Sequence, residues 1–233
     1  IVFDSDPVDE FAECRLKARF LTGLTNDFEL FETMLATQRG IVHRDLHLAR
    51  IEKSAGYFGF AFDRDAAAAA LDQACGELAE GAFRMRFSLK QDGATSIQSA
   101  PLVALDEPVA VLLAPDATRS DDLFLRHKTS VRSRYDAAWR DAEAQGAFDT
   151  LFFNERGELA EGGRSNVFVK LDGRWYTPPL SSGALPGVMR SVLLADPSWD
   201  ASERVITREM LDSAEDIVVC NALRGPLRAV LSF

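Results

Sequence analysis

Leu125-Arg-His-Lys-Thr-Ser130 and Glu158-Leu-Ala-Glu-Gly-Gly-Arg-Ser-Asn-Val-Phe168 are the two most informative segments of this sequence. The first segment carries an amine, Lys128, and the second carries a carboxylate, Glu161. A single lysine is usually a solvated surface cation, and a glutamate in such a segment can simply close a turn. The significance of this pair therefore depends on the other motifs that accompany it.

Two further motifs favour the binding of a phosphate group. Arg50 ends the motif His47-Leu-Ala-Arg50, and a guanidinium can hold a phosphate through a charge-assisted fork of hydrogen bonds. The segment Leu185-Pro-Gly-Val-Met-Arg190 reads as a turn that leads into a helix. Proline suits the first residues of a helix, and the free N–H groups just after it bind anions well.

The four features together match the requirements of pyridoxal 5′-phosphate. This cofactor needs an amine to link to, an acid that keeps its pyridine nitrogen protonated, and a cationic, amide-rich site for its phosphate. Lys128 would supply the amine, Glu161 the acid and Arg50 the phosphate contact. We therefore predict a pyridoxal phosphate enzyme, in which Lys128 also transfers protons.

Residues 28–225 resemble the class IV aminotransferase family, and within it the 4-amino-4-deoxychorismate lyases. The resemblance implies an α/β (α+β) enzyme of fold type IV with two domains, like the D-amino-acid and branched-chain aminotransferases. The matching segments are Phe28-Glu-Leu-Phe-Glu-Thr33, His47-Leu-Ala-Arg50, His127-Lys-Thr129, Glu161 to Phe168, Leu185-Pro-Gly187 and Cys220-Asn-Ala-Leu-Arg-Gly225.

The resemblance also assigns roles to further residues. Tyr135 would hydrogen-bond the cofactor's 3-hydroxyl, although it lies further beyond the lysine than in branched-chain transaminases. The backbone N–H groups of Val188, Met189 and Ala222 would complete the phosphate site. Transaminase relatives tend to carry threonine where Met189 and Ala222 stand, so two hydroxyl contacts are absent. Thr33 matches a lyase position whose hydroxyl lies close to the substrate.

Arginines provide candidate contacts for an anionic substrate. Phe83-Arg-Met-Arg-Phe-Ser-Leu-Lys90 alternates apolar and polar residues, which predicts a strand with Arg84 and Arg86 on one face. That face could simply be the solvated side of an edge strand. Alternatively, one or both guanidiniums bind a substrate carboxylate, and Arg224 is a comparable candidate.

The N-terminal segment carries a second resemblance. Residues 1–18 are similar to the extreme C-terminus of chorismate-utilising enzymes such as aminodeoxychorismate synthase component I, with Glu13 and Lys17 at the positions of a magnesium and chorismate site. Only this tail is present, so that site is incomplete in this chain. The resemblance suggests a fused synthase–lyase, or a relative whose first domain was lost.

Length and composition restrict the class of protein. With 233 residues, 47% of them hydrophobic, the chain can form one large or two modest cores. A net charge of −10 disfavours nucleic-acid binding, and no apolar run approaches the roughly 20 residues of a membrane span. The three cysteines and three histidines lack the spacing of a metal site, so we predict no metal. The three scattered cysteines also do not suggest a disulfide framework, which favours a cytoplasmic enzyme.

Periodicity and breaker residues predict the domain organisation. We expect a synthase-like tail at 1–21, a small α/β domain at 22–114, a linker at 115–122 and a larger cofactor-binding domain at 123–233. The expected strands are 28–35, 83–90, 107–114, 149–154, 167–171, 175–177, 217–220 and 229–233, and the expected helices 43–58, 65–78, 133–145, 186–196 and 207–214.

The predicted activity is the conversion of 4-amino-4-deoxychorismate to 4-aminobenzoate and pyruvate, a step of folate biosynthesis. A transaminase acting on D- or branched-chain amino acids would use the same lysine and glutamate. A third possibility is a non-catalytic module that dimerises or holds a synthase partner. The family resemblance also implies a homodimer.

Overall fold

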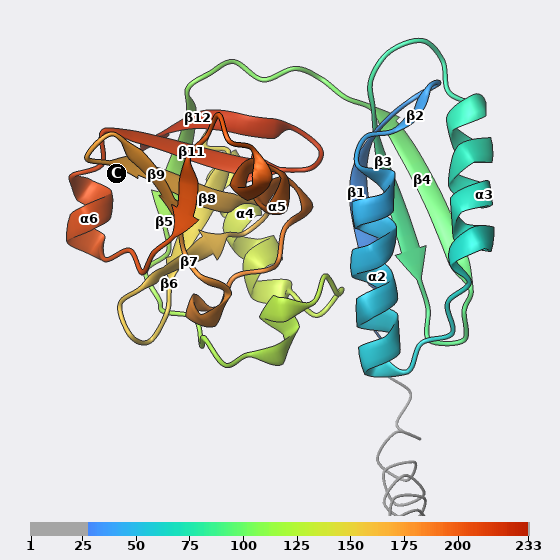
Figure 1. Ribbon diagram of the computed structural model, residues 1–233, viewed down its shortest axis with the longest axis horizontal. Coiled ribbons are helices and arrows are strands. Elements are labelled where there is room, and N and C mark those ends of the chain that lie inside the picture. The colour runs from blue at the N-terminus through green and yellow to red at the C-terminus, as the bar shows by residue number, and fades with distance from the viewer. Residues whose placement is uncertain (1–27, 233) are drawn as a thin grey trace, which may run out of the picture.

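The computed structural model describes residues 28–232, so the synthase-like tail predicted at 1–21 lies outside the described residues. The first part of the described chain forms a four-stranded antiparallel sheet in the order β2-β1-β3-β4, beside two helices (Figure 1). The elements of this small lobe are β1 (Leu30–Thr37), β2 (Gly40–Ile41), α2 (Arg44–Phe58), α3 (Arg64–Gly76), β3 (Phe83–Leu89) and β4 (Thr95–Pro101).

The two faces of the small sheet differ in character because side chains alternate along a strand. Leu30 and Met34 of β1 join Met85 and Phe87 of β3 in one buried apolar cluster with residues of α2 and α3. The intervening side chains of β1 and β3 point to the opposite face, toward the larger lobe. The predicted strands and helices of this region are therefore present, and Asp63 caps α3 by accepting a hydrogen bond from the N–H of Ala66 (2.9 Å).

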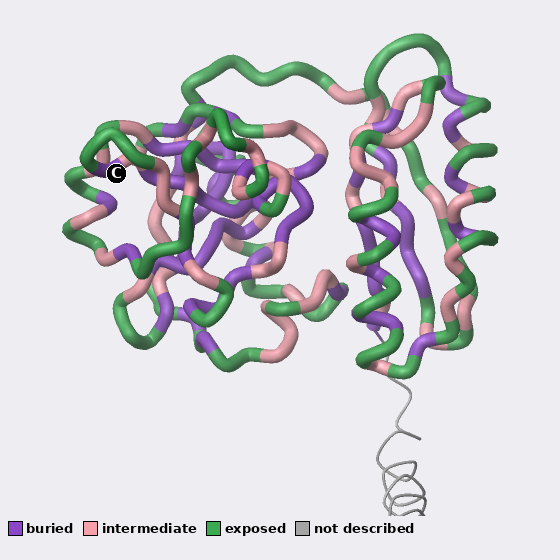
Figure 2. The backbone as a smooth tube through the Cα atoms, viewed as in Figure 1, coloured by how far each residue is buried: buried purple, intermediate pink, exposed green. Residues whose placement is uncertain are grey.

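The larger lobe is built on an eight-stranded mixed sheet in the order β10-β9-β8-β11-β12-β5-β6-β7. Two apolar clusters form its core, one around β5, β6, β8, β11 and β12, the other beneath α5, and Figure 2 shows the buried backbone concentrated there. Its elements are β5 (Val109–Leu113), η1 (Leu123–Arg126), α4 (Ser133–Ala144), β6 (Asp149–Phe153), β7 (Leu159–Gly162), β8 (Asn166–Leu171), β9 (Arg174–Thr177), η2 (Leu180–Ser182), α5 (Val188–Ala195), β10 (Ala201–Glu203), α6 (Arg208–Asp212), β11 (Asp216–Asn221) and β12 (Gly225–Leu231).

The position of β5 moves the boundary between the lobes. This strand pairs in parallel with β12 and β6 of the larger sheet, so the chain crosses between the sheets at 102–108. The predicted boundary at 114 and linker at 115–122 were therefore placed too late. The sequence prediction identified the strand, but its sheet membership depends on pairing with β6, 38 positions further along the chain, and with β12, 120 positions further along. A local pattern does not encode such pairing.

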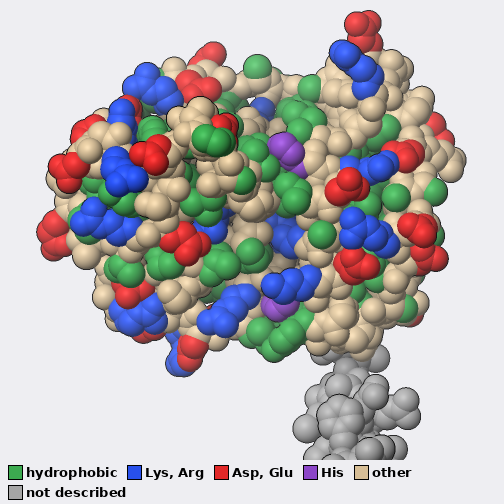
Figure 3. Space-filling view, viewed as in Figure 1, with side chains coloured by type: hydrophobic (Ala, Val, Ile, Leu, Met, Phe, Trp, Pro, Cys, Tyr) green, Lys and Arg blue, Asp and Glu red, His purple; other side chains and the backbone are tan. Residues whose placement is uncertain are grey.

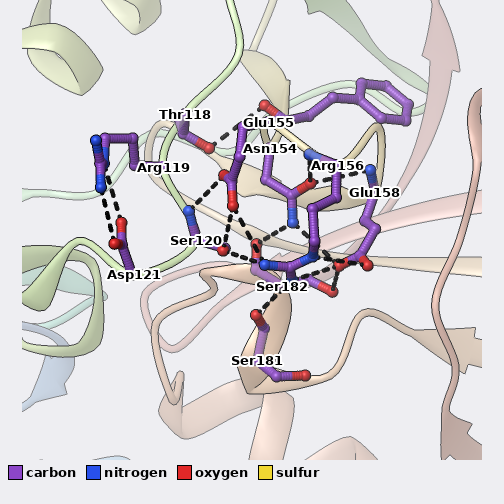
Figure 4. A network of polar contacts seen from close by, with 11 residues as sticks. Thr118, Arg119, Ser120, Asp121, Asn154, Glu155, Arg156, Glu158, Ser181 and Ser182 are labelled. Carbon is purple, nitrogen blue, oxygen red and sulfur yellow. Dashed lines mark hydrogen bonds and ion pairs between the residues drawn. The ribbon is translucent and has the colours of Figure 1, made fainter.

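The segment at 115–122 is instead fixed by polar contacts (Figure 4). Ser120 donates its backbone N–H and its hydroxyl to the two carboxylate oxygens of Glu155 (2.8 and 2.6 Å). Asn154 and Ser182 extend the network, since the Asn154 amide donates to the Ser182 carbonyl and the Ser182 hydroxyl donates to Glu158 (3.0 and 2.7 Å). These contacts join three separate loops beside the functional cavity.

The two lobes also meet through the segment that carries Lys128. The N–H of Phe31 donates to the Lys128 carbonyl (3.1 Å), and the N–H of Ser130 donates to the Glu29 carbonyl (2.9 Å). The main chain around the lysine is thus held against the first strand of the small sheet. Within residues 28–232, no helix combines the length and the apolar character that crossing a bilayer requires.

Candidate active site

A cavity of about 540 Å³ lies between the two lobes. Its walls come from β1 and β3 of the small sheet and from α4, β7, the start of α5 and the β11–β12 turn of the larger lobe. Figure 3 shows Lys and Arg side chains gathered around the hollow between the lobes. The cavity walls are rich in positive charge although the chain carries a net charge of −10, which suits an anionic ligand.

Lys128 lies in the wall of this cavity, between η1 and α4. Burial lowers the pKa of its ammonium group, and the positive charges of Arg132 and Arg50 lower it further, to about 7. A lysine with an ordinary pKa would be almost entirely protonated near neutral pH. About half of Lys128 is therefore a free amine near pH 7, the form that attacks a carbonyl carbon.

Glu161 belongs to β7 and also faces the cavity. Its Oε2 accepts hydrogen bonds from the backbone N–H of Leu185 (2.9 Å) and the side-chain amide of Asn166 (3.3 Å). Burial raises the pKa of the carboxyl to about 7, and the Leu185 N–H and the charges of Arg132 and Lys128 oppose that rise. Such a carboxyl is suited to an ion pair with a protonated ring nitrogen, because a cation at that point would restore its ionised form.

Tyr135 projects from α4 with its ring packed on Phe152, 4.6 Å between ring centroids. Its buried hydroxyl makes no well-formed hydrogen bond among the described residues. Burial raises the pKa of the phenol, and the charge of Glu161 and a weak hydrogen-bonding contact with that carboxyl raise it further. A buried hydroxyl without a good hydrogen bond is unfavourable, so we expect the Tyr135 hydroxyl to bind a further partner. A ligand oxygen in the cavity would supply it.

The predicted phosphate site is assembled at the start of α5. Gly187 precedes this helix and no side chain caps it, which leaves the N–H groups of Val188 and Met189 at the positive end of the helix. Ala222, in the turn between β11 and β12, lies on the same cavity wall. The three predicted backbone donors are therefore brought together from segments far apart in the chain.

Arg50 reaches the cavity from α2, but its fork is already occupied. Its Nε donates to Glu32 Oε1 (2.8 Å), its Nη2 donates to Glu32 Oε2, and its Nη1 donates to the Pro186 carbonyl (3.3 Å). His47 Nδ1 also contacts Glu32 (2.7 Å). Of the five guanidinium N–H bonds, one on Nη1 and one on Nη2 remain for a phosphate. Arg50 is thus oriented in advance by a buried acid that the sequence analysis did not identify.

The small sheet contributes an aromatic and cationic wall. Thr33 and Arg86 are register partners on β1 and β3, and the Arg86 guanidinium lies 3.8 Å from the centre of the Phe31 ring. Lys128 Nζ lies 4.7 Å from the same ring. Arg84 also lines the cavity. Among the described residues, neither Arg84 nor Arg86 has a hydrogen-bonded acid, so both remain free to bind an anion.

Among the predicted site residues within 28–232, Arg224 alone does not line the cavity. Its guanidinium instead donates to the Val103 carbonyl in the crossing between the lobes. Conversely, Arg132, Asn166 and Glu32 surround the predicted residues but were not singled out from the sequence. Asn166 lies within the Glu161–Phe168 motif and Arg132 shortly after Lys128, and their proximity in sequence was the only available signal.

Comparison with known proteins agrees with this geometry. The family model described as "Amino-transferase class IV" matches residues 29–231. The chain belongs to the class IV aminotransferases. The structure of "a Putative amino-acid aminotransferase" from Mesorhizobium loti is similar to this chain, with a TM-score of 0.81 and 37% identity, covering 88% of this chain and 100% of that one.

Two further relatives illustrate the range of the family. A protein of Schizosaccharomyces pombe named "Putative aminodeoxychorismate lyase" is 28% identical over 153 residues, which cover 64% of this chain and 66%, just under two thirds, of that protein. A structure described as "A hypothetical aminotransferase from Mycobacterium tuberculosis, PLP-bound form" has a TM-score of 0.77 and 21% identity, covering 88% of this chain and 81% of that one.

The fold-type IV prediction is confirmed, and pyridoxal 5′-phosphate is the cofactor of the class IV aminotransferase family to which the chain belongs. The site fits the cofactor at several independent points. Lys128 offers an amine that is partly deprotonated near pH 7, Glu161 an acid, and Tyr135 a buried hydroxyl without a well-formed hydrogen bond among the described residues. At the start of α5, a Cβ on Gly187 would collide with Asn166 Oδ1 at 1.9 Å, so the close packing there requires glycine.

Proposed function

We propose that this chain is a 4-amino-4-deoxychorismate lyase, which releases 4-aminobenzoate and pyruvate. The substrate carries one carboxylate on its ring, a second on its enolpyruvyl ether, and an amine on the ring carbon opposite the first carboxylate. An enzyme for it needs a cationic wall at a fixed distance from the reactive lysine. The S. pombe relative, named as such a lyase, supports this assignment.

The observation that carries the proposal is the arrangement around Phe31. Arg86 and Lys128 both contact this ring, at 3.8 and 4.7 Å from its centre. Thr33, one strand pleat away, is paired in register with Arg86. A flat, ring-shaped substrate could thus have its carboxylate on Arg86 and its amine-bearing carbon beside Lys128, with the Thr33 hydroxyl along its edge.

The side chains divide the chemical work as follows. Bound pyridoxal phosphate supplies an electron sink for the carbon that bears the substrate amine. Glu161 holds the proton on the cofactor's pyridine nitrogen, and the N–H of Leu185 orients that carboxylate (2.9 Å). Lys128 Nζ removes the proton from the amine-bearing carbon, a role that its lowered pKa of about 7 permits near neutral pH.

Loss of the enolpyruvyl group completes the reaction. The carbon–oxygen bond breaks, the ring becomes aromatic, and the departing enolpyruvate takes one proton on its methylene carbon to give pyruvate. The proton that Lys128 removed balances this step, so no second substrate is consumed. Lys128 itself or the Thr33 hydroxyl delivers it, and both groups line the cavity.

An amino-acid transaminase is the alternative, because the M. loti protein at 37% identity is named as an aminotransferase. A transaminase would use Lys128 and Glu161 in the same way but would transfer the amine to a 2-oxo acid. The two activities differ in their products: the lyase forms pyruvate without a 2-oxo acid acceptor, whereas the transaminase requires one.

The test is to measure pyruvate release from aminodeoxychorismate generated in situ by a separate synthase. Pyruvate and 4-aminobenzoate in equal amounts would support the lyase. Yellow, cofactor-loaded protein that makes no pyruvate but transfers amine from D- or branched-chain amino acids would favour the transaminase. Colourless protein that cannot be reconstituted with the cofactor would favour a non-catalytic module.

We also propose that the chain works in the cytoplasm as a homodimer and receives its substrate from an aminodeoxychorismate synthase component. Exposed apolar side chains in the crossing between the lobes, Val103 (75% exposed) and Leu105 (40% exposed), offer area for such contacts. Light scattering on the purified protein, alone and mixed with a synthase, would test both associations. A monomer under both conditions would contradict them.

A further inference from the structure

Arg132 links the two segments that carry the cofactor residues. It stands four residues after Lys128, just before α4, and its Nη2 donates to the carbonyl of Gly163, two residues beyond Glu161. Its Nε donates to Asp136 on the first turn of α4 (2.9 Å). A single guanidinium therefore spans the lysine segment, the helix that carries Tyr135, and the glutamate loop.

The same side chain lies near the aromatic ring that the reactive amine contacts. The Arg132 guanidinium lies 5.8 Å from the centre of the Phe31 ring, and Lys128 Nζ lies 4.7 Å from that centre. The Arg132 side chain is only 15% exposed, so solvent screens its charge weakly. The contact to Asp136 and the Gly163 carbonyl holds the charge in one place.

We propose that Arg132 is a positioning residue, which holds the Lys128 segment against the Glu161 loop and maintains a fixed positive charge beside the Lys128 amine. None of its predicted effects depends on the identity of the substrate. The inference therefore rests on the cofactor site alone, and it can fail or succeed independently of the proposed lyase activity.

The electrostatic part of this role has a definite sign. A nearby cation disfavours the protonated form of a nitrogen, and Arg132 is the largest charged contribution to the lowered pKa of Lys128. Removing that charge should make protonation of the nitrogen easier. Lys128 also interacts electrostatically with Arg50 and His47 of α2, Glu32 of β1 and Glu161 of β7.

The mechanical part requires a guanidinium. Arg132 uses two different nitrogens for two acceptors in a planar fork, which the single ammonium of lysine does not reproduce. Substitution by lysine therefore keeps the charge and loses the link, and substitution by glutamine loses both. Arg140, exposed on the same helix and outside the cavity lining, provides a control with the same change in net charge.

The experiment compares Arg132→Gln, Arg132→Lys and Arg140→Gln in two measurements on the full chain. The first is the pH midpoint of the visible absorbance of pyridoxal phosphate linked to Lys128. The second is the dissociation constant of pyridoxal phosphate from the reconstituted protein. Arg132→Gln should raise the midpoint by about one pH unit and weaken binding about tenfold.

Arg132→Lys should weaken binding similarly while its midpoint stays near the wild-type value, and Arg140→Gln should change neither quantity. An unchanged midpoint in Arg132→Gln, or an equal shift in the lysine and glutamine variants, would overturn the proposal. If Arg132→Gln does not fold, Arg132→Lys decides: wild-type binding or a raised midpoint in that variant would refute the assigned role.

Discussion

Asn166 occupies the space that a side chain on Gly187 would need, since a Cβ built on Gly187 would lie 1.9 Å from Asn166 Oδ1. The amide nitrogen of Asn166 donates to Glu161 Oε2 (3.3 Å) and to the Leu185 carbonyl (3.0 Å). One side chain thus links the acid of the cofactor site to the turn that precedes α5. The two ends of the cofactor site are built as one unit.

Substitution of Gly187 by alanine should therefore weaken cofactor binding. Asn166 must move to accept the extra methyl group, and overpacking of this kind typically costs about 1–3 kcal/mol, equivalent to a loss of affinity of roughly 5- to 150-fold. Titration of cofactor-free protein with pyridoxal phosphate, followed by absorbance, would measure it. Gly56→Ala is the control, because no atom lies within 4 Å of its added Cβ; equal affinity in both variants would contradict the prediction.

The sequence was sufficient to predict most of the elements and to select residues that line one cavity. Alternation of apolar and polar residues located β3, and helical spacing of apolar residues located α2. The segments of β1 and α4 were also expected as a strand and a helix. The chemistry of the motifs predicted that Lys128 and Glu161 belong to one site, and both residues line the same cavity. These features depend on local patterns and on residue types with distinctive chemistry, which a sequence displays directly.

Contacts between distant segments were not predictable in the same way. Arg50 was expected to present its fork to the phosphate, but the structure places that fork on Glu32. Arg224 looked comparable to Arg86 in sequence, yet it bonds the Val103 carbonyl outside the cavity. In both residues the charge was visible, while the direction of the side chain depends on tertiary packing.

Lys128→Ala should abolish the yellow colour and turnover while leaving the fold intact. The substitution removes the amine that links to the cofactor, and it also removes a buried group whose charged form is disfavoured. We expect the cofactor-free variant to unfold at a temperature equal to or above that of the wild type. Absorbance after borohydride treatment and thermal unfolding would measure the two effects; full activity would refute the assignment of the lysine.

Glu161→Gln should show a stability gain that depends on pH. In the folded protein burial raises the pKa of this carboxyl from 4.5 to about 7. The raised value means that the cost of burying the ionised form is absent below pH 4.5 and complete above pH 7. Glutamine carries no charge at any pH, so the free energy of unfolding of the cofactor-free variant should exceed that of the wild type by roughly 2–4 kcal/mol at pH 8.

Urea unfolding of the two cofactor-free proteins at pH 4.5 and pH 8 would measure this difference. At pH 4.5 the two free energies of unfolding should nearly coincide, because the wild-type carboxyl is then mostly protonated in the fold. The same variant should lose turnover at both pH values, since glutamine does not hold a proton on the cofactor's ring nitrogen. If the variant were less stable than the wild type by the same amount at both pH values, burial would not destabilise the ionised form of Glu161.

Arg86→Gln should impair substrate binding without affecting the cofactor. Arg86 is partly buried, stacks on Phe31 at 3.8 Å and lacks a hydrogen-bonded acid among the described residues, so a substrate carboxylate would gain a charge-assisted contact there. Losing one such contact costs about 1.5–3 kcal/mol, or roughly 10- to 150-fold in kcat/KM. Arg84→Gln should cost less, because Arg84 is exposed and solvent screens its charge.

Steady-state kinetics and a pyridoxal phosphate titration of both variants would separate the effect on substrate binding from the effect on cofactor binding. A larger loss for Arg84→Gln, or loss of the cofactor from Arg86→Gln, would place the carboxylate site elsewhere in the cavity.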